Sequence, residues 1–170
     1  MNNNTINSQM PDDVIFSSPN IIYQQQSSHR FLICDESSWF DYNLKNREGL
    51  RILLVEDSPL ISKVHLSHLL RMGYEVDVAT TGSEAIELFN KNGNYYAVLL
   101  DIGLPDMSGV EVCKTIKAMQ QQSNQSVIPV IALTTQVDEQ SRRNYKAVGI
   151  HSIYSKPVNW QRLSVALDKL

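Results

Sequence analysis

Residues 96–109 have the sequence YAVLLDIGLPDMSG, in which an apolar run ends at Asp101 and a polar turn follows. A similar run, RILLV at 51–55, is followed by Glu56 and Asp57. Neither run alternates with polar residues, which is typical of strands buried on both faces of a parallel sheet. The tendency of apolar residues to be buried explains the runs themselves, but it does not explain why acidic residues come directly after them. We therefore expect buried parallel strands with carboxylates at their ends.

Segments typical of strands and of helices alternate five times on either side of this stretch. The alternation predicts an α/β fold with a doubly wound parallel sheet. Right-handed crossovers place helices on both faces and gather the carboxyl ends of the strands at one edge, where such sheets bind ligands. Strands are expected at 51–55, 74–79, 96–101, 127–134 and 152–154, and helices at 59–72, 82–90, 109–120, 138–148 and 160–170.

Several residues of the expected helices carry specific predictions. Ser58 and Pro59 are expected as N-cap and first residue of the first helix. His65 and His68 lie three residues apart on that helix, and since no third metal ligand accompanies them, both are expected at the surface. Cys113 is expected as a core thiol. Apolar stripes run along two of these helices: Leu60, Ile61, Val64, Leu66, Leu69 and Leu70 on the first and Leu163, Val165, Ala166, Leu167 and Leu170 on the last.

Residues 1–49 differ in composition from residues 50–170. They are rich in Asn, Gln and Ser and show only short apolar bursts, at Val14–Phe16, Ile21–Tyr23 and Phe31–Cys34. This composition predicts a largely flexible N-terminal extension or linker before a single domain at 50–170. The alternative is that Phe31–Cys34 or Trp39–Tyr42 docks on the domain or on a second copy.

Charge and cysteine usage exclude several classes of protein. The net charge is −3, and no cluster of four or more Lys or Arg occurs, so neither nucleic acid nor an anionic membrane is an expected partner. The N-terminus does not resemble a signal peptide, and apolar stretches such as 127–133 are too short to cross a bilayer. The two cysteines match no metal or redox spacing, which fits a reducing cytoplasm.

Polar residues follow four of the five expected strands. They are Glu56 and Asp57, Asp101, Thr134, and Lys156 after the last strand. Each has an ordinary explanation when it is taken singly, for example an acidic pair at a helix start. Their coincidence at one sheet edge favours a common site, and carboxylates so close together need a compensating cation. Oxygen ligands of this kind suit Mg²⁺.

This set of residues predicts phosphoryl transfer to a carboxylate. Asp101 is the expected nucleophile, which would form an acyl phosphate. Lys156 would supply a second cation and Thr134 a hydroxyl hydrogen bond, since positioning and electrostatics are most of what this chemistry requires. The expected metal ligands are Asp57, Asp101 and the Gly103 carbonyl, with Glu56 acting mainly through water.

Four motifs in this order and spacing resemble the receiver domain of bacterial response regulators and hybrid sensor kinases. They are VEDS at 55–58, DIGLPDMSG at 101–109, ALTT at 132–135 and YSKP at 154–157. The resemblance covers about Arg51 to Leu170 and implies a flavodoxin-like sheet of order 2-1-3-4-5 with five helices. It also implies that Asp101 accepts phosphate from a histidine kinase or a histidine phosphotransfer protein. A receiver of this kind is not a dedicated enzyme.

The resemblance further implies a switch and a docking surface. Thr134 and an aromatic residue on strand five should report phosphorylation to the face of helix four, strand five and helix five, which is also the expected homodimer face. Ile153 occupies the position where many receivers have the aromatic, and Tyr154 is the candidate that remains. The expected partner patch consists of Ile61, Val64, Pro157 and Val158.

Three alternatives remain open at this point. No output domain is expected after Leu170, so the signal should leave by protein contact or onward phosphotransfer, unless the chain is a fragment of a hybrid kinase. Aspartate-nucleophile phosphatases usually need a second Asp two residues after the nucleophile, where this chain has Gly103. A pseudo-receiver should have lost acidic or lysine positions, and none is lost here.

Overall fold

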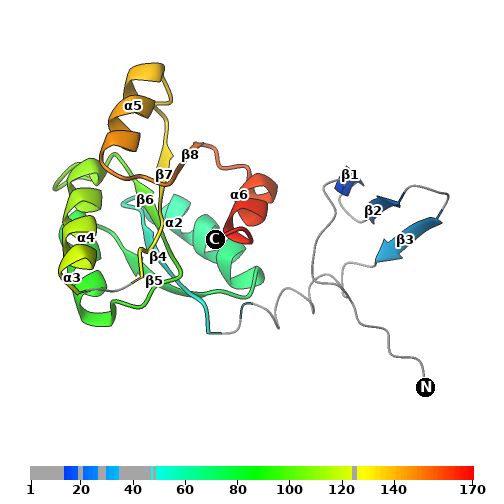
Figure 1. Ribbon diagram of the computed structural model, residues 1–170, viewed down its shortest axis with the longest axis horizontal. Coiled ribbons are helices and arrows are strands. Elements are labelled where there is room, and N and C mark those ends of the chain that lie inside the picture. The colour runs from blue at the N-terminus through cyan, green and yellow to red at the C-terminus, as the bar shows by residue number, and fades with distance from the viewer. Residues whose placement is uncertain (1–13, 19–20, 27–29, 35–46, 48, 124–125) are drawn as a thin grey trace. The chain divides into compact units, whose positions relative to one another are not determined.

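The computed structural model describes residues 14–18, 21–26, 30–34, 47, 49–123 and 126–170 (Figure 1). The chain divides into two compact units, Met1–Asn46 and Arg47–Leu170. Each unit has a sheet of its own. The alternative that Trp39–Tyr42 docks on another surface concerns residues outside the described ranges.

The first unit contains an antiparallel sheet of three strands. These are β1 (Val14–Ser18), β2 (Ile21–Gln26) and β3 (Arg30–Cys34), with β2 in the centre. Each strand includes one of the apolar bursts, although sequence analysis assigned no strands there because bursts of three or four residues give no reliable periodicity. The flexible character of residues 1–49 stays a prediction.

The second unit is built on a parallel sheet in the order β5-β4-β6-β7-β8, whose strands are labelled in Figure 1. This order is 2-1-3-4-5 when the strands are counted along the unit, so the predicted flavodoxin-like sheet is confirmed. The order reverses between β4 and β6, which makes the gap between their carboxyl ends the switch point of the sheet. The strands are β4 (Arg51–Val55), β5 (Glu75–Ala79), β6 (Ala97–Asp101), β7 (Val130–Thr134) and β8 (Ser152–Ser155).

Each strand of this sheet is followed by a helix. Ser58 caps the first helix as predicted, since its Oγ accepts a hydrogen bond from the Ile61 N–H and Pro59 follows it. No helix in the described part of the chain combines the length and apolar character that crossing a membrane requires. The helices are α2 (Pro59–Arg71), α3 (Gly82–Asn92), α4 (Gly109–Ser123), α5 (Glu139–Ala147) and α6 (Trp160–Leu167).

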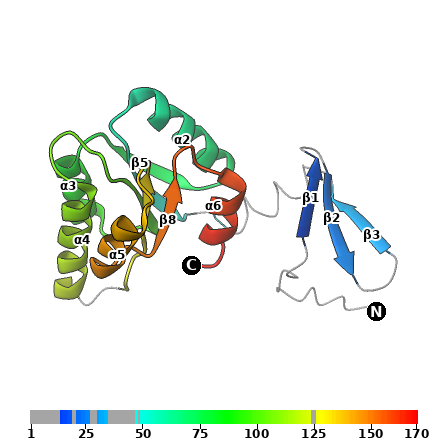
Figure 2. The same ribbon diagram turned by 90° about the horizontal axis from the view of Figure 1, so that it is seen from above.

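The helices cover both faces of the sheet (Figure 2). On one face, α2 and α6 pack against the strands through Leu69 and Leu163. On the other, α3 and α4 contribute Phe89 and Cys113, which confirms the predicted core thiol. Every residue of β6 and β7 is buried. The polar residues at the carboxyl ends of these strands, Asp101 and Thr134, are among the buried residues.

The buried face of α2 differs from the predicted stripe. Ser62, His65 and Leu69 are buried, a spacing that places them on one side of the helix. The prediction counted apolar residues without fixing the rotation of the helix about its axis, which packing against the sheet decides. Leu60, Ile61, Val64 and Leu70 belong to that stripe but are exposed.

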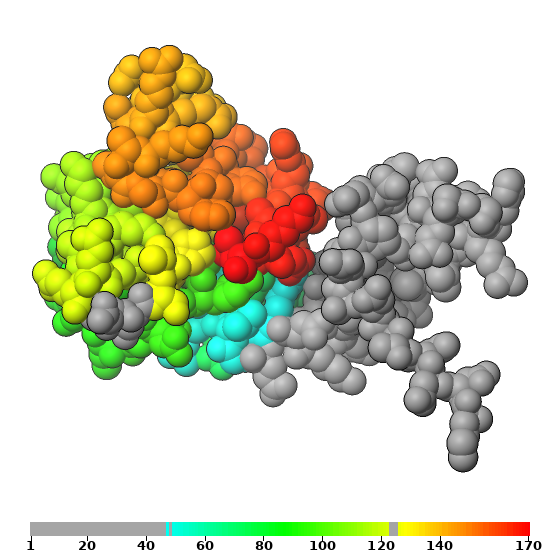
Figure 3. Space-filling view, in the orientation of Figure 1, coloured from blue at the N-terminus to red at the C-terminus, as the bar shows by residue number. Residues whose placement is uncertain are grey.

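The boundaries of several elements also differ from the predictions. β7 begins at Val130, directly after Pro129, because proline has no N–H to donate to a neighbouring strand. α6 ends at Leu167 and not at Leu170. Val165 and Leu170 belong to the predicted apolar stripe but are exposed. In the space-filling view of Figure 3, α5 (orange) stands out from the body of the second unit.

Candidate functional site

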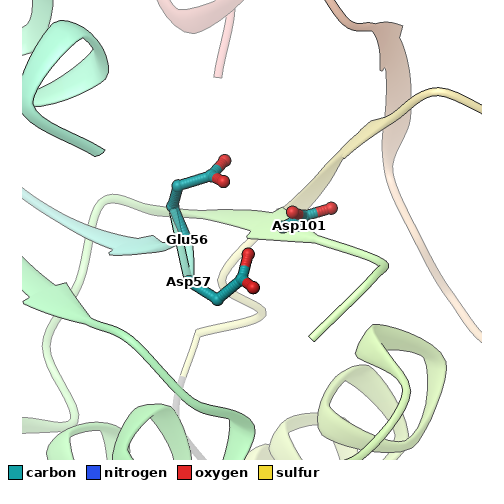
Figure 4. A group of neighbouring side chains, drawn as sticks. All are labelled: Glu56, Asp57 and Asp101. Carbon is teal, nitrogen blue, oxygen red and sulfur yellow. The ribbon is translucent and has the colours of Figure 1, made fainter. Parts of the chain in front are cut away.

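Three carboxylates meet at the switch point between β4 and β6 (Figure 4). Glu56 and Asp57 directly follow β4, and Asp101 is the last residue of β6. One oxygen atom from each carboxylate lies within 4.8 Å of the other two. Glu56 and Asp101 are buried, whereas Asp57 is exposed. The cluster therefore offers only oxygen ligands and is accessible from the side of Asp57.

The ammonium group of Lys156 lies between two of these carboxylates. Its Nζ donates to Glu56 Oε2 and to Asp101 Oδ2, both at 2.6 Å. Its backbone N–H donates to the Thr134 carbonyl at 2.8 Å, which fixes the segment after β8 to the end of β7. Burial lowers the pKa of Lys156, but the hydrogen bonds to Asp101 and Glu56 outweigh burial and raise it. Lys156 is therefore charged at neutral pH.

Both oxygen atoms of the Asp101 carboxylate are held. The Gly103 N–H donates to Oδ1 at 3.0 Å, and Lys156 donates to Oδ2. The residue is 8% exposed. Since one donor comes from the loop after β6 and the other from the segment after β8, the orientation of this carboxylate depends on the tertiary structure.

The cluster fits a hard divalent cation. Three carboxylates face one ammonium group, and Glu56 Oε1 is buried without a hydrogen-bond partner in the described part of the chain. Burial raises the pKa of Glu56, although Lys156 opposes the shift. Mg²⁺ prefers such oxygen ligands and keeps several waters. Glu56 was expected to act mainly through water, and the structure gives it a direct contact with Lys156.

Thr134 lies at the same edge as the carboxylates. Asp101 pairs with Leu133 across β6 and β7, so Thr134 is one residue further toward the edge. Its side chain is buried, and its Oγ1 accepts from the Gln136 N–H at 3.0 Å. The next residue, Thr135, is exposed. The structure thus brings the expected hydroxyl to the end of the strand that neighbours β6.

The structure does not bring Tyr154 to the same face of the sheet as Thr134. Ala132 packs in the cluster under α3, α4 and α5, and Thr134 shares its side of β7 because side chains alternate along a strand. Tyr154 packs on the opposite face with α2 and α6, and Ile153 packs on the Thr134 face. The switch role of Tyr154 stays a prediction, and a direct Thr134–Tyr154 contact would need a rearrangement.

The expected partner patch lies beside the site. Ile61 and Val64 on α2 are 36% and 46% exposed. Pro157 is exposed and Val158 is partly buried, and both follow Lys156. Leu60, a member of the predicted apolar stripe, is 74% exposed on the same helix and enlarges the apolar surface. The docking role of this patch stays a prediction.

His65 is buried, and the expectation that it lies at the surface is wrong. Its ring meets Trp160 edge-on at 5.2 Å between centroids, and His68 stacks on the same indole at 4.7 Å. His65 Nδ1 lies 3.8 Å from Glu56 Oε2. Sequence analysis missed this arrangement because Trp160 is contributed by α6, far along the chain.

The environment of His65 disfavours its charged form. Burial, followed by the charges of Lys156 and His68, lowers its pKa from 6.5 to about 4, although Asp101 acts in the opposite direction. Glu56 is the other charged neighbour. Since the unfolded chain takes up this proton below about pH 6.5 and the folded chain does so only near pH 4, protonation stabilises the unfolded state between these values.

Substitution of His65 should therefore weaken the acid sensitivity of the fold. We expect the free energy of unfolding of the wild type to lose on the order of 2 kcal/mol more than that of His65→Phe when the pH is lowered from neutral toward 4. Urea unfolding at several pH values measures the difference. Substitution of the exposed His151 by glutamine, His151→Gln, serves as the control for removal of a histidine. Equal pH profiles for the wild type and His65→Phe would contradict the expectation.

The fold and this site together define a signalling domain with an acidic pocket. Residues 52–168 match the response regulator receiver domain, and the chain belongs to this family. It carries the receiver domain of a two-component or phosphorelay system, a signalling module and not a dedicated enzyme. Domains of this family bind Mg²⁺ at an acidic pocket, which here corresponds to the cluster of Glu56, Asp57 and Asp101.

Known proteins of several kinds are similar to this chain. The aerobic respiration control sensor protein ArcB of Escherichia coli (strain K12) is 36% identical over 130 residues, which cover 76% of this chain but only 16% of ArcB. The chemotaxis protein CheY4 of Vibrio cholerae matches the structure with a TM-score of 0.64 and 30% identity, covering 71% of this chain and 97% of CheY4.

A third similarity concerns a receiver with a bound partner. The co-crystal structure of the Saccharomyces cerevisiae histidine phosphotransfer protein Ypd1 and the receiver domain of Ssk1 contains a chain that matches with a TM-score of 0.67 and 25% identity. The match covers 72% of this chain and 89% of that chain.

Proposed function

We propose that Asp101 accepts a phosphoryl group from a phosphohistidine on a histidine kinase or a histidine phosphotransfer protein. The observation that carries the proposal is the contact of Lys156 Nζ with Asp101 and Glu56, both at 2.6 Å. It places a charged ammonium group directly at a buried carboxylate at the switch point of the sheet. A kinase that uses ATP acts in the cytoplasm, where the proposal places this domain.

The reaction is a displacement at phosphorus. A carboxylate oxygen of Asp101 forms the new O–P bond as the P–N bond to the donor imidazole breaks, and the imidazole leaves with the electron pair of that bond. Mg²⁺, held by Asp57, Asp101 and the Gly103 carbonyl, would neutralise charge on the phosphoryl oxygens when it is bound. Lys156 supplies a fixed positive charge, and the Thr134 hydroxyl donates a hydrogen bond to the transferred group.

The phosphoryl group would be lost by hydrolysis, in which a water oxygen forms a bond to phosphorus as the bond to the Asp101 oxygen breaks and inorganic phosphate leaves. This step involves the residues that face solvent beside Asp101. Gly103 has no side chain, and a Cβ built on it would lie 3.9 Å from Asp101 Oδ1, in ordinary contact. Both Gly103 and Thr135 are exposed. Water can therefore approach an acyl phosphate on Asp101, and the domain would catalyse its own dephosphorylation.

The partner would dock on the apolar patch beside the site. Ile61 and Val64 on α2, with Pro157 and Val158, offer apolar side chains close to Lys156. The Ssk1 receiver is known in complex with a phosphotransfer protein, which supports this kind of partner. A homodimer through the face of α5, β8 and α6 would be a separate consequence of phosphorylation.

The second candidate is that this chain is a receiver segment of a hybrid histidine kinase. A 33% identical match to the hybrid signal transduction histidine kinase M of Dictyostelium discoideum, which covers 89% of this chain and 6% of that protein, supports this origin. Both candidates assign the same chemistry to Asp101. They differ in whether the donor histidine belongs to the same polypeptide, which the identity of the full-length protein would decide.

A small phosphodonor tests the role of Asp101 directly. Incubation with acetyl phosphate and Mg²⁺ should add the mass of one phosphoryl group to the wild type, while Asp101→Asn and the wild type in excess chelator should show no adduct. Intact-mass spectrometry measures the result. A phosphoryl adduct that still forms in Asp101→Asn would contradict the assignment of Asp101 as the phosphoacceptor. Rapid turnover of a general phosphomonoester would instead favour a phosphatase. Failure of the wild type to form an adduct would favour a pseudo-receiver.

A further inference from the structure

The segment 102–108 connects the phosphoacceptor strand β6 to helix α4. It contains Gly103, whose N–H donates to Asp101 Oδ1 at 3.0 Å and whose carbonyl is the proposed metal ligand. At the far end, the Glu111 carboxylate accepts from the Ser108 N–H at 2.9 Å, and Ser108 Oγ accepts from the Val110 N–H at 3.2 Å. The position of Gly103 therefore depends on how the whole segment is held.

Asp106 holds the middle of this segment against the start of α3. Its Oδ1 accepts from the Gly82 N–H at 2.8 Å, and its Oδ2 accepts from the N–H and the Oγ of Ser83 at 2.9 and 2.8 Å. These bonds, the Gly82 N–H first, lower the pKa of Asp106 to about 2. The carboxylate is therefore charged throughout the neutral range.

The local cap of α3 does not supply these bonds. Thr81 is the N-cap, and its Oγ1 accepts from the Glu84 N–H at 3.1 Å. Helices begin with N–H groups that have no partner inside the helix. The remaining two in this first turn, those of Gly82 and Ser83, are bonded by Asp106, which lies more than twenty residues away in sequence. The contact is therefore tertiary.

Close packing against two glycines, Gly82 and Gly109, also holds the same segment. A Cβ on Gly82 would lie 2.5 Å from Met107 Cγ, so α3 begins directly against the segment. A Cβ on Gly109 would lie 2.5 Å from the Asp101 carbonyl oxygen, so α4 begins directly against the phosphoacceptor. The Gly109 N–H also donates to the Ile102 carbonyl at 3.0 Å.

We infer that Asp106 is a positioning residue for the phosphorylation site, because it joins segment 102–108 to α3 and thereby keeps the Gly103 backbone beside Asp101. This inference rests on the proposed function for its consequence in metal binding and phosphorylation. Asp106 itself touches neither Asp101 nor the proposed ligands through a hydrogen bond in the described part of the chain. Its effect passes through the backbone.

The chain offers a matched control for Asp106. Asp138 is also an exposed aspartate at a helix start, where Oδ1 and Oδ2 accept from the N–H and the Oγ of Ser141 at 2.9 and 2.6 Å. Hydrogen bonds from the Ser141 side chain and backbone lower its pKa. Its partners belong to its own helix, so Asp138→Ala removes a cap without releasing segment 102–108.

The experiment compares Asp106→Ala, Asp106→Asn and Asp138→Ala in the full chain, at a temperature well below the unfolding midpoint of each. Mg²⁺ binding is measured by calorimetry and adduct formation with acetyl phosphate by intact mass. Asp106→Ala should bind Mg²⁺ about tenfold more weakly and react more slowly in proportion, at the low end of effects seen for residues that support metal ligands. Asp106→Asn keeps one acceptor oxygen, so its Mg²⁺ affinity and its rate of adduct formation should lie between those of the wild type and Asp106→Ala. Asp138→Ala should match the wild type in both quantities.

A spectroscopic measurement separates positioning from general stability. The Gly103 amide resonance should shift in Asp106→Ala without Mg²⁺ and should stay in place in Asp138→Ala. Wild-type Mg²⁺ affinity and an unshifted Gly103 amide in Asp106→Ala would overturn the inference. A wild type that takes no phosphate would overturn the proposed function instead, and the Gly103 amide would still decide whether Asp106 holds the segment.

Discussion

Substitution of Lys156 by methionine should lower the free energy of unfolding by about 3 kcal/mol near neutral pH, because it leaves buried carboxylates without their cation. The Glu56 and Asp101 side chains are 1% and 11% exposed, so water replaces the lost ammonium poorly. Adduct formation from acetyl phosphate should fall at least about a hundredfold, since the fixed charge beside the transferred group is lost.

The pH dependence identifies the cause of this loss. Burial already raises the pKa of Glu56, and Lys156 opposes the shift, so the variant should have a Glu56 pKa higher still. A folded state that binds the proton more tightly than the unfolded state gains stability as the pH falls. The stability that Lys156→Met loses relative to the wild type should therefore be smaller near pH 5 than near pH 7, as urea unfolding of both proteins would measure.

Two further variants control this result. Glu56→Gln combined with Lys156→Met should recover at least half of the lost stability, because no buried carboxylate then remains at position 56. Lys63→Met removes an exposed lysine from α2 and should stay within about 0.5 kcal/mol of the wild type. If Lys156→Met unfolds at the same urea concentration as the wild type near pH 7, the stability of the fold does not depend on the Lys156 ammonium group.

Substitution of Arg47 by methionine should cost about 2 to 3 kcal/mol, the range for hydrogen bonds to charged groups. Arg47 is 3% exposed, and its guanidinium lies 4.9 Å from the centre of the Tyr74 ring. Its Nε donates to Asp168 Oδ1 at 3.1 Å and its Nη1 to the Met72 carbonyl at 3.0 Å, while Nη2 contacts Asp168 and Ser164. One side chain thus joins the ends of α2 and α6.

Arg51 supplies the matched comparison. It pairs with Glu75 at 2.7 Å, but the two side chains are 41% and 52% exposed, and exposed pairs contribute about 0 to 1 kcal/mol. Arg51→Met should therefore change the unfolding midpoint in urea much less than Arg47→Met. Equal effects of the two substitutions would show that the burial of Arg47 has no energetic consequence.

The fold and the residues of the site were largely predictable because their signals are local. Apolar runs that end in Glu56 and Asp101 locate strands and their carboxyl ends, and the rule that parallel strands gather these ends at one edge brings them together. Capping by Ser58 was equally local, since the bond reaches only three residues along the chain. Such features need no knowledge of rotation or of distant partners.

Features that depend on two distant segments were not predictable in the same way. His65 was expected at the surface, but α2 turns it inward against Trp160 of α6. Arg47 was assigned to the extension, although its partners lie at the ends of α2 and α6. No role was predicted for Asp106, because its three donors come from the start of α3, a distant part of the chain.

The sequence by itself determined the order of strands and helices and the acidic and basic residues of the site, because residue type and spacing along one chain suffice for both. Only the tertiary structure decided which Asp101 oxygen meets Lys156 and which meets Gly103, and that His65 packs against Trp160. These outcomes depend on the rotation of each element and on contacts across the sheet, which local spacing does not specify.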